Sequence, residues 1–377
     1  MPNVIFRHED GTAVEVAVTA GENLLEVARK ANVAIDAPCS GNGSCGKCRV
    51  KYVSGELETE KTRHISDEEF EEGWRLSCLS KVTGDVEVMV PDIASAYKSR
   101  MKVADLSSRK EVAIFDKARE EVAESGIAFQ NVFSVVDLSM DEPTLDDTMP
   151  DNERLIRAVQ EATGAEHVGL TYQALKKLPD VLREQQFHVS AVLKNMDGKL
   201  MVYDVRPSGE EKLCAAAIDI GTTTVSGVIL DMRDGKILAK ASSGNGQIRF
   251  GADVINRIIE SRKEGGQEKL QKAIIEETIN PMLHNMCHAA GIHGSSIYHM
   301  CVASNTTMNH LFAGVNADPL RMEPYIPAFF ETDSINAYDL GLHVHPDASV
   351  VIAPNIGSYV GGDITAGTLV SMIWNKP

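Results

Sequence analysis

The segment "CSGNGSCGKC" at residues 39–48 constrains this chain most, because it places three cysteines within ten residues. Glycine, serine and asparagine fill nearly every gap, so the backbone can wrap closely around whatever the thiols hold. A disulfide knot, a zinc site and an iron–sulfur cluster are the structures that bring thiols so close together. The seven cysteines are an odd number, which favours metal or redox chemistry over a disulfide framework.

The spacing of the cysteines distinguishes between the two kinds of metal site. A zinc ribbon brings two CxxC pairs, whereas here only Cys45 and Cys48 form such a pair. Cys39 precedes that pair with five residues between, and Cys78 follows it with 29 residues between. A [2Fe–2S] cluster takes several ligands from one loop and the last from a distant segment. The pattern therefore favours a [2Fe–2S] cluster over zinc.

Charge and hydropathy exclude several classes of protein. The formal net charge of −17 argues against a nucleic-acid binder, which needs a basic face to neutralise phosphates. No apolar run approaches the roughly 18–20 residues of a membrane span. The first sixteen residues, "MPNVIFRHEDGTAVEV", carry charges where a signal peptide needs an apolar stretch. We therefore expect a cytoplasmic protein without a membrane partner.

Periodicity and composition predict a multi-domain chain of α+β and α/β type, in four regions. Residues 1–93 combine a hairpin, one principal helix and a small mixed sheet, and residues 94–126 form a linker that contains a helix. Residues 127–210 form a small α+β domain without a chemical motif, which indicates a spacer or docking module. Residues 211–377 begin with strand, turn, strand and end in a glycine-rich turn that leads into a helix.

The turn "DIGTTT" at residues 219–224 carries the second chemical signal. An apolar strand delivers Asp219 to a tight turn whose amides and hydroxyls can surround phosphate oxygens, and a second apolar strand leaves it. Asp219 would orient Mg²⁺ through water, because Mg²⁺ gives up its hydration shell reluctantly. The GxxxxGK[ST] pattern of a P-loop is absent.

The hairpin, the single helix and the late fourth cysteine make residues 1–93 resemble a β-grasp [2Fe–2S] ferredoxin of the adrenodoxin type. The resemblance implies that the cluster ligands are Cys39, Cys45, Cys48 and Cys78. An acidic segment at residues 67–72 precedes the last of them. It is either a partner-docking surface, as in such ferredoxins, or a solvated helix face.

The context of "DIGTTT" resembles the first phosphate motif of the actin-like ATPase superfamily, which includes acetate and sugar kinases. The segments "VASNTTMNH" and "GSYVGGDITAG" fall where that superfamily draws further loops into its nucleotide cleft. The resemblance implies ATP with Mg²⁺ as cofactor, Asp219 and Asp363 as catalytic residues, and Asp363 as the group that orients the attacking water or hydroxyl. Asp253 is a further acidic candidate or a helix cap. The nucleotide-contacting residues it implies are Gly221, Thr222, Thr223, Thr224, Asn305, Thr306, Gly361 and Gly362.

The whole order of motifs resembles the reductive activators of corrinoid-dependent methyltransferases. The resemblance implies ATP-dependent reduction of a Co(II) corrinoid protein to Co(I) by an electron from the cluster, with an external low-potential donor and a possible homodimer. Two other functions remain open: a ferredoxin-type electron-transfer protein with a non-catalytic nucleotide-sensing or scaffold domain, and a small-molecule kinase with an appended ferredoxin domain. The chain stops before a second phosphate motif and an adenosine motif, so we expect an incomplete ATPase domain that does not turn over ATP unaided.

Overall fold

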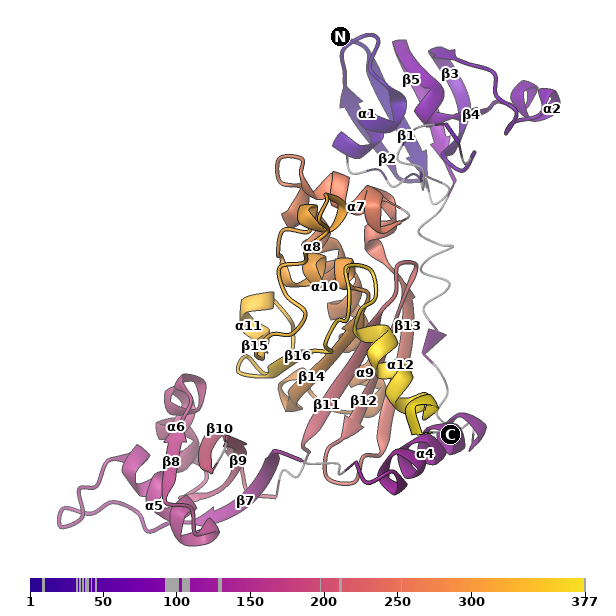
Figure 1. Ribbon diagram of the computed structural model, residues 1–377. Coiled ribbons are helices and arrows are strands. Elements are labelled where there is room, and N and C mark those ends of the chain that lie inside the picture. The colour runs from indigo at the N-terminus through magenta and orange to yellow at the C-terminus, as the bar shows by residue number, and fades with distance from the viewer. Residues whose placement is uncertain are drawn as a thin grey trace.

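The computed structural model describes residues 1–8, 11–31, 33, 35, 37, 41, 43–44, 46–91, 102–103, 109–127, 131–196, 198–209, 212–251 and 253–375. Within these residues the chain forms three β-sheets of five, four and seven strands, each with its own helices (Figure 1). The predicted multi-domain architecture of α+β and α/β type is confirmed. Among the helices of these residues, none is both long and apolar enough to span a membrane.

The first sheet has the strand order β2-β1-β5-β3-β4. Its elements are β1 (Asn3–His8), β2 (Ala13–Ala17), α1 (Leu24–Lys30), β3 (Arg49–Thr59), α2 (Asp67–Glu71), β4 (Trp74–Leu76) and β5 (Ser80–Val90). The predicted hairpin is the antiparallel pair β1–β2, and β1 also runs parallel to β5. Helix α1 begins at the cap Asn23, whose side chain accepts from two backbone amides of the first turn. The helix buries its apolar face, made by Leu24, Leu25, Val27 and Ala28, against the sheet.

The second sheet has the strand order β7-β9-β10-β8 and carries two helices. Its elements are β7 (Phe133–Ser139), α5 (Asp151–Thr163), β8 (His167–Leu170), α6 (Tyr172–Glu184), β9 (His188–Met196) and β10 (Lys199–Pro207). The β9–β10 pair is the predicted hairpin; of its turn, Asp197 lies outside the described residues and Gly198 has a φ of +90°. Leu155 and Leu178, from the two helices, are fully buried in the core of this sheet.

The third sheet has the strand order β15-β16-β14-β11-β12-β13-β6. Strands β11, β14 and β16 run parallel, whereas β11, β12 and β13 form the antiparallel meander that the sequence predicts. Its strands are β6 (Lys102–Val103), β11 (Cys214–Ile220), β12 (Thr224–Asp231), β13 (Ile237–Gly244), β14 (Ile297–Ser304), β15 (Ile335–Asn336) and β16 (Ser349–Ile352). The helices around it are α4 (Arg109–Glu124), α7 (Val254–Ser261), α8 (Gly266–Ile274), α9 (Asn280–Ala290), α10 (Thr306–Ala313), α11 (Ala337–Leu340) and α12 (Gly362–Ser371).

The long helix expected over residues 267–290 contains one irregular turn. Helix α8 continues through a π-helical turn (Ile275–Ile279) directly into α9. The Thr278 hydroxyl donates to the carbonyl oxygen of Ala273 at 2.7 Å and accepts from the Gly246 amide at 3.1 Å. A side chain that bonds back to its own helix in this way accommodates the wider turn and ties it to the neighbouring loop.

Part of the expected linker at residues 94–126 packs on the third sheet. Strand β6 pairs with β13, and helix α4 lies beside α12 (Figure 1). The Arg119 guanidinium donates to the carbonyl oxygen of Asp234 in the β12–β13 turn at 2.8 Å. Val122 is buried, but Ile114 is 70% exposed, so the apolar face expected for this helix is only partly covered.

The second and third sheets meet through an apolar contact surrounded by polar groups. Phe133 and Tyr203 of the second sheet pack against Tyr298 at the start of β14. Lys194 donates to the Ser349 hydroxyl at 3.1 Å, and burial lowers the pKa of this lysine. The expected spacer is therefore in contact with the sheet that follows it.

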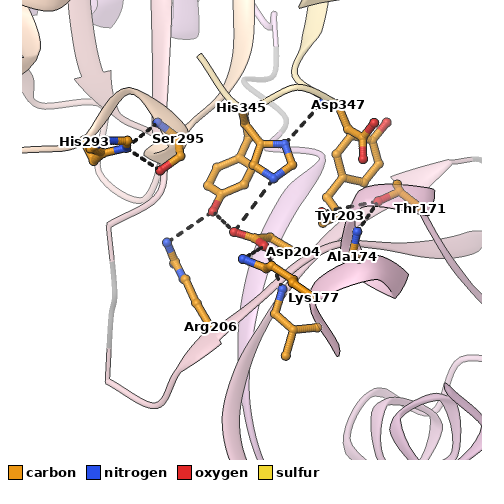
Figure 2. A network of polar contacts seen from close by, with 12 residues as sticks. Thr171, Ala174, Lys177, Tyr203, Asp204, Arg206, His293, Ser295, His345 and Asp347 are labelled. Carbon is orange, nitrogen blue, oxygen red and sulfur yellow. Dashed lines mark hydrogen bonds and ion pairs between the residues drawn. The ribbon is translucent and has the colours of Figure 1, made fainter. Parts of the chain in front are cut away.

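A buried carboxylate, Asp204 of β10, lies at the centre of this contact (Figure 2). Tyr298 donates to its Oδ2 at 2.7 Å, Lys177 of α6 forms an ion pair with its Oδ1, and Nε2 of His345 lies 3.9 Å from Oδ2. The Asp347 amide donates to Nδ1 of His345 at 3.2 Å, which leaves the ring proton on Nε2, facing the carboxylate. Burial alone would raise the pKa of Asp204, but His345, Lys177 and Tyr298 outweigh it and lower the pKa to about 2.

Candidate functional site

Two of the four predicted cluster ligands are described, and they lie together. Cys48 directly precedes β3, and Cys78 lies in the short turn between β4 and β5. Their sulfur atoms are 3.1 Å apart and both side chains are buried. A disulfide bond is about 2.05 Å long, so this pair is not a disulfide. Cys39 and Cys45 lie outside the described residues, so the four-cysteine ligand set stays a prediction.

The backbone around the two thiols is held by bonds from neighbouring elements. The Ser77 amide donates to the carbonyl oxygen of Cys48 at 2.8 Å. Asn23, the cap of α1, donates from its side-chain amide to the carbonyl oxygen of Cys78 at 2.8 Å. The principal helix of the module therefore fixes the position of the distant cysteine.

Glycines let the loop pass close to these groups. Gly41, Gly43 and Gly46 have φ angles of +96°, +76° and +67°. A Cβ at Gly41 would lie 3.8 Å from Cys78 Cβ, and one at Gly46 would lie 2.6 Å from His64 Cβ. Side chains larger than hydrogen do not fit there, so the loop forms a close cradle beside the buried thiols. Close-lying thiolates in such a cradle fit an iron–sulfur cluster.

Metal ligation by other groups has no support in the described part of the chain. No group of three or more His, Cys, Asp or Glu side chains there is placed to hold a metal, although this part leaves out Cys39 and Cys45.

The three loops expected around a nucleotide meet at one edge of the third sheet. Ile220 at the end of β11 pairs with Ser304 at the end of β14, and Val302 pairs with Ile352 at the end of β16. Ligands of sheets with parallel strands bind outside the carboxyl ends of those strands. The turns that follow β11, β14 and β16 therefore share the edge where a ligand would bind.

The backbone of the "DIGTTT" turn is anchored from behind. Asn245 donates from its side chain to the carbonyl oxygen of Gly221 and from its amide to that of Thr223, both at 2.9 Å. The fully buried Arg257 donates to the carbonyl oxygen of Thr222. Burial lowers the pKa of Arg257 to about 10, against the opposing effect of the Asp253 carboxylate. Sequence reasoning missed both anchors.

The two predicted catalytic carboxylates lie near each other. Asp219 is the last but one residue of β11, and Asp363 lies in the first turn of α12. Desolvation raises the pKa of Asp219, and the negative charge of Asp363 raises it further. Two carboxylates that repel each other at an accessible sheet edge are a suitable environment for a hydrated cation. Thr223 and Thr224 are exposed on the same turn.

Asn305 and Thr306 have structural partners at this edge. The Asn305 side chain caps α10 by accepting from the Met308 amide at 3.0 Å. The buried Thr306 donates to the carbonyl oxygen of Gly357. Both residues therefore build the framework of the loops, and their contact with a nucleotide stays a prediction.

The glycine turn before α12 packs without any space for side chains. A Cβ at Gly361 would collide with the carbonyl oxygen of Ser304, and one at Gly362 with that of Ala353. The glycines of "YVGGD" thus allow the third loop to lie directly on the second. Asp253 accepts from the Asn256 amide at 2.9 Å and caps α7, which is the alternative role foreseen for it.

A ferredoxin-like module with paired thiols, followed by two sheets of which the last carries three converging loops, defines a multi-domain iron–sulfur protein. Residues 7–83 match the family model described as 2Fe-2S iron-sulfur cluster binding domain. Residues 122–212 match the RACo linker region and residues 214–376 match the RACo middle region. The chain belongs to the RACo family, that of the reductive activators of corrinoid proteins.

Individual relatives agree with this assignment. "Corrinoid activation enzyme RamQ" of Eubacterium limosum is 26% identical over 357 residues, which are 93% of this chain and 53% of that protein. A solved structure described as "Reductive activator for corrinoid,iron-sulfur protein" has a TM-score of 0.57 and 31% identity, covering 100% of this chain and 58% of that one. This chain thus spans a little more than half the length of both relatives.

The N-terminal module has relatives of its own. One is a component of the Na(+)-translocating NADH-quinone reductase of Actinobacillus succinogenes, which is 38% identical over 85 residues. These residues are 22% of this chain and 21% of that protein, so the likeness is confined to the N-terminal module.

Proposed function

We propose that this chain acts in the ATP-dependent reductive activation of a corrinoid protein. The family assignment and the names of the two long relatives support this, together with the convergence of three loops and two carboxylates at one sheet edge. The convergence of these loops is the observation that carries the ATP-dependent part of the proposal.

The N-terminal module supplies the electron in this proposal. A [2Fe–2S] cluster held by Cys39, Cys45, Cys48 and Cys78 transfers one electron at a time between an external low-potential donor and the acceptor. The acceptor is the substrate, a Co(II) corrinoid, which takes up one electron and becomes Co(I). The buried thiol pair and its glycine cradle keep water away from the sulfur atoms.

Energy is the reason for joining such a module to a nucleotide site. A one-electron transfer that runs uphill by about 59 mV meets a tenfold adverse equilibrium, or about 1.4 kcal/mol. Plant-type clusters have potentials near −400 mV. If the Co(I) couple lies some 100–200 mV lower, the gap amounts to roughly 2.5–5 kcal/mol. ATP can close it only through a conformational equilibrium that nucleotide and corrinoid protein both bias.

The residues at the sheet edge have distinct roles in this mechanism. Asp219 orients hydrated Mg²⁺, and the hydroxyls of Thr223 and Thr224 face the phosphate oxygens. Asp363 accepts a hydrogen bond from the water that attacks the γ-phosphate in line. Arg257 and Asn245 hold the turn from behind, so the turn keeps its shape when the anionic ligand arrives.

The test mixes anaerobically purified, dithionite-reduced protein with a purified corrinoid iron–sulfur protein in the Co(II) state, with and without Mg-ATP. We expect the cobalt absorption and EPR spectra to change only with ATP. A change that is independent of ATP would favour a simple electron-transfer protein. ATP consumption that requires a small hydroxyl or carboxylate substrate and ignores the cluster would favour a kinase. Either result overturns the proposal.

A further inference from the structure

One arginine connects three segments of the N-terminal module. Arg49, the first residue of β3, follows Cys48 directly. Its guanidinium donates through Nε to the carbonyl oxygen of Gly46 at 3.3 Å, and through Nη2 to that of His64 at 2.6 Å. Its Nη1 donates to Oε1 of Glu69 at 2.7 Å. These contacts join the cysteine loop to the acidic helix α2.

Glu69 holds the guanidinium rigidly, because both of its carboxylate oxygens are engaged. Oε2 accepts from the Ser66 amide at 2.9 Å, while the Ser66 hydroxyl accepts from the Glu69 amide at 3.2 Å. This is a capping box at the start of α2. The hydrogen bond from Arg49, followed by that from Ser66, lowers the pKa of Glu69, so the carboxylate is ionised at neutral pH.

The other end of the contact is the peptide between two predicted cluster ligands. Gly46 has a φ of +67° and packs on His64 with no room for a Cβ. The peptide bond that follows Gly46 is planar, so a carbonyl held toward the guanidinium turns the Lys47 amide to the opposite side. The Arg49 amide also donates to the carbonyl oxygen of Lys47 at 2.7 Å. Two successive carbonyl groups of the loop are thus fixed by one residue.

We propose that Arg49 is a positioning residue for electron transfer, which holds the Gly46 peptide in one orientation while Glu69 holds Arg49. The inference rests on the proposed [2Fe–2S] cluster. A loop free of this contact turns its peptide dipoles toward the sulfur atoms in several orientations, and a carbonyl oxygen near them disfavours the added electron of the reduced state. Helix α2 therefore contributes to the reduction potential through its link to the loop.

Three variants of the full chain separate position from charge. Arg49→Lys keeps the charge but loses the planar fork, Arg49→Gln loses both, and Glu69→Gln weakens the support of the guanidinium. Lys61→Gln is the matched control, since Lys61 pairs with Asp67 of the same helix at 2.7 Å and is 70% exposed. It removes one positive charge near α2 and breaks one ion pair, without a bond to the loop.

Redox titration followed by EPR gives the potential of each variant. We expect Arg49→Lys and Arg49→Gln to disfavour the reduced state about tenfold, a shift of about 59 mV to more negative potential. Glu69→Gln should give a smaller shift of the same sign, and Lys61→Gln should stay within threefold of the unaltered chain. Amide hydrogen exchange over residues 43–48 should be faster in both Arg49 variants, a readout that does not depend on electron transfer.

The outcomes distinguish this inference from the proposed function. An unaltered chain that holds no iron and no inorganic sulfide contradicts the proposed function itself. If the chain holds its cluster but Arg49→Lys matches the unaltered chain in potential and exchange, Arg49 acts by charge alone and the inference is wrong. If Arg49→Gln does not fold, Arg49→Lys and Glu69→Gln still decide between these results.

Discussion

Tyr298 of the third sheet donates its phenolic hydrogen to Asp204 of the second sheet across 2.7 Å, and both groups are buried. We expect Tyr298→Phe to lower the free energy of unfolding by about 1.5–3 kcal/mol, because a buried hydrogen bond to a charged group is lost. Urea denaturation measures this loss. Tyr172→Phe, at a residue that is 71% exposed, is the control and should stay within about 0.5 kcal/mol. Equal effects of the two changes would contradict a structural role for the contact.

Asp204 gives this contact a defined dependence on pH. Its pKa is lowered from 3.8 to about 2 through His345, Lys177 and Tyr298, so its contribution to stability is present above about pH 4 and is lost as the pH falls toward 2. The size of this contribution is about 2–2.5 kcal/mol. Urea titrations of the unaltered chain and of Asp204→Asn between pH 6 and pH 2 should show their difference in stability shrinking over this interval. A difference that stays constant with pH would show that the Asp204 charge has no such role.

Cys78 provides a direct test of the cluster. Cys78→Ser should abolish the visible absorption of the reconstituted chain and lower its iron content by more than half, since one thiolate ligand is lost. Iron and sulfide analysis measures the effect, and far-UV circular dichroism reports on folding. Cys301→Ser, which changes an exposed thiol of β14, is the control and should keep the full iron content.

Gly361 tests the close packing of the loops at the sheet edge. Gly361→Ala should destabilise the chain by about 1–3 kcal/mol, because the added Cβ would collide with the Ser304 carbonyl oxygen. Gly357→Ala adds the same methyl group where no atom lies within 4 Å, and should change stability little. Thermal unfolding followed by circular dichroism compares the two. A Gly361→Ala chain as stable as Gly357→Ala would show that the loops can separate without cost.

Asp219 and Asp253 separate the two roles foreseen for acidic residues near the turn. Asp219→Asn should weaken binding of Mg-ATP at least tenfold, because the carboxylate that orients the hydrated cation is lost. Asp253→Asn keeps a capping side chain at α7 and should leave both binding and stability nearly unchanged. Isothermal titration calorimetry measures both affinities. Equal losses would place Asp253 at the cation as well.

Local patterns predicted the elements that depend on neighbours in sequence. Alternation gave the β1–β2 hairpin, and helical spacing gave the buried face of α1. The loops at the sheet edge were also accessible, because "DIGTTT" and the glycine turn each follow an apolar strand and parallel strands bring such turns to one edge.

The contacts that join distant segments were not predictable in the same way. Tyr298 and Asp204 are 94 residues apart, and no period relates them. One signal existed: Asp204 interrupts a run of buried residues in β10, and a charge in such a place needs partners. Arg257 offered a similar signal within "DVINRI", as a cation in a helix whose other residues are largely apolar. Neither signal identifies the partner, because the partner depends on how the sheets pack.

The pairing of β6 with β13 limits how far the first sheet can move from the third. From Val90, which ends β5, to Lys102, which begins β6, the chain advances twelve residues, since 102 − 90 = 12. A fully extended chain covers about 3.3–3.6 Å per residue, so the connection reaches about 40 Å at most. A donor confined to such a radius meets an acceptor bound along the β13 edge at an effective concentration on the order of millimolar. Encounter between the two would then be independent of dilution, and only the arrival of the corrinoid protein would follow second-order kinetics.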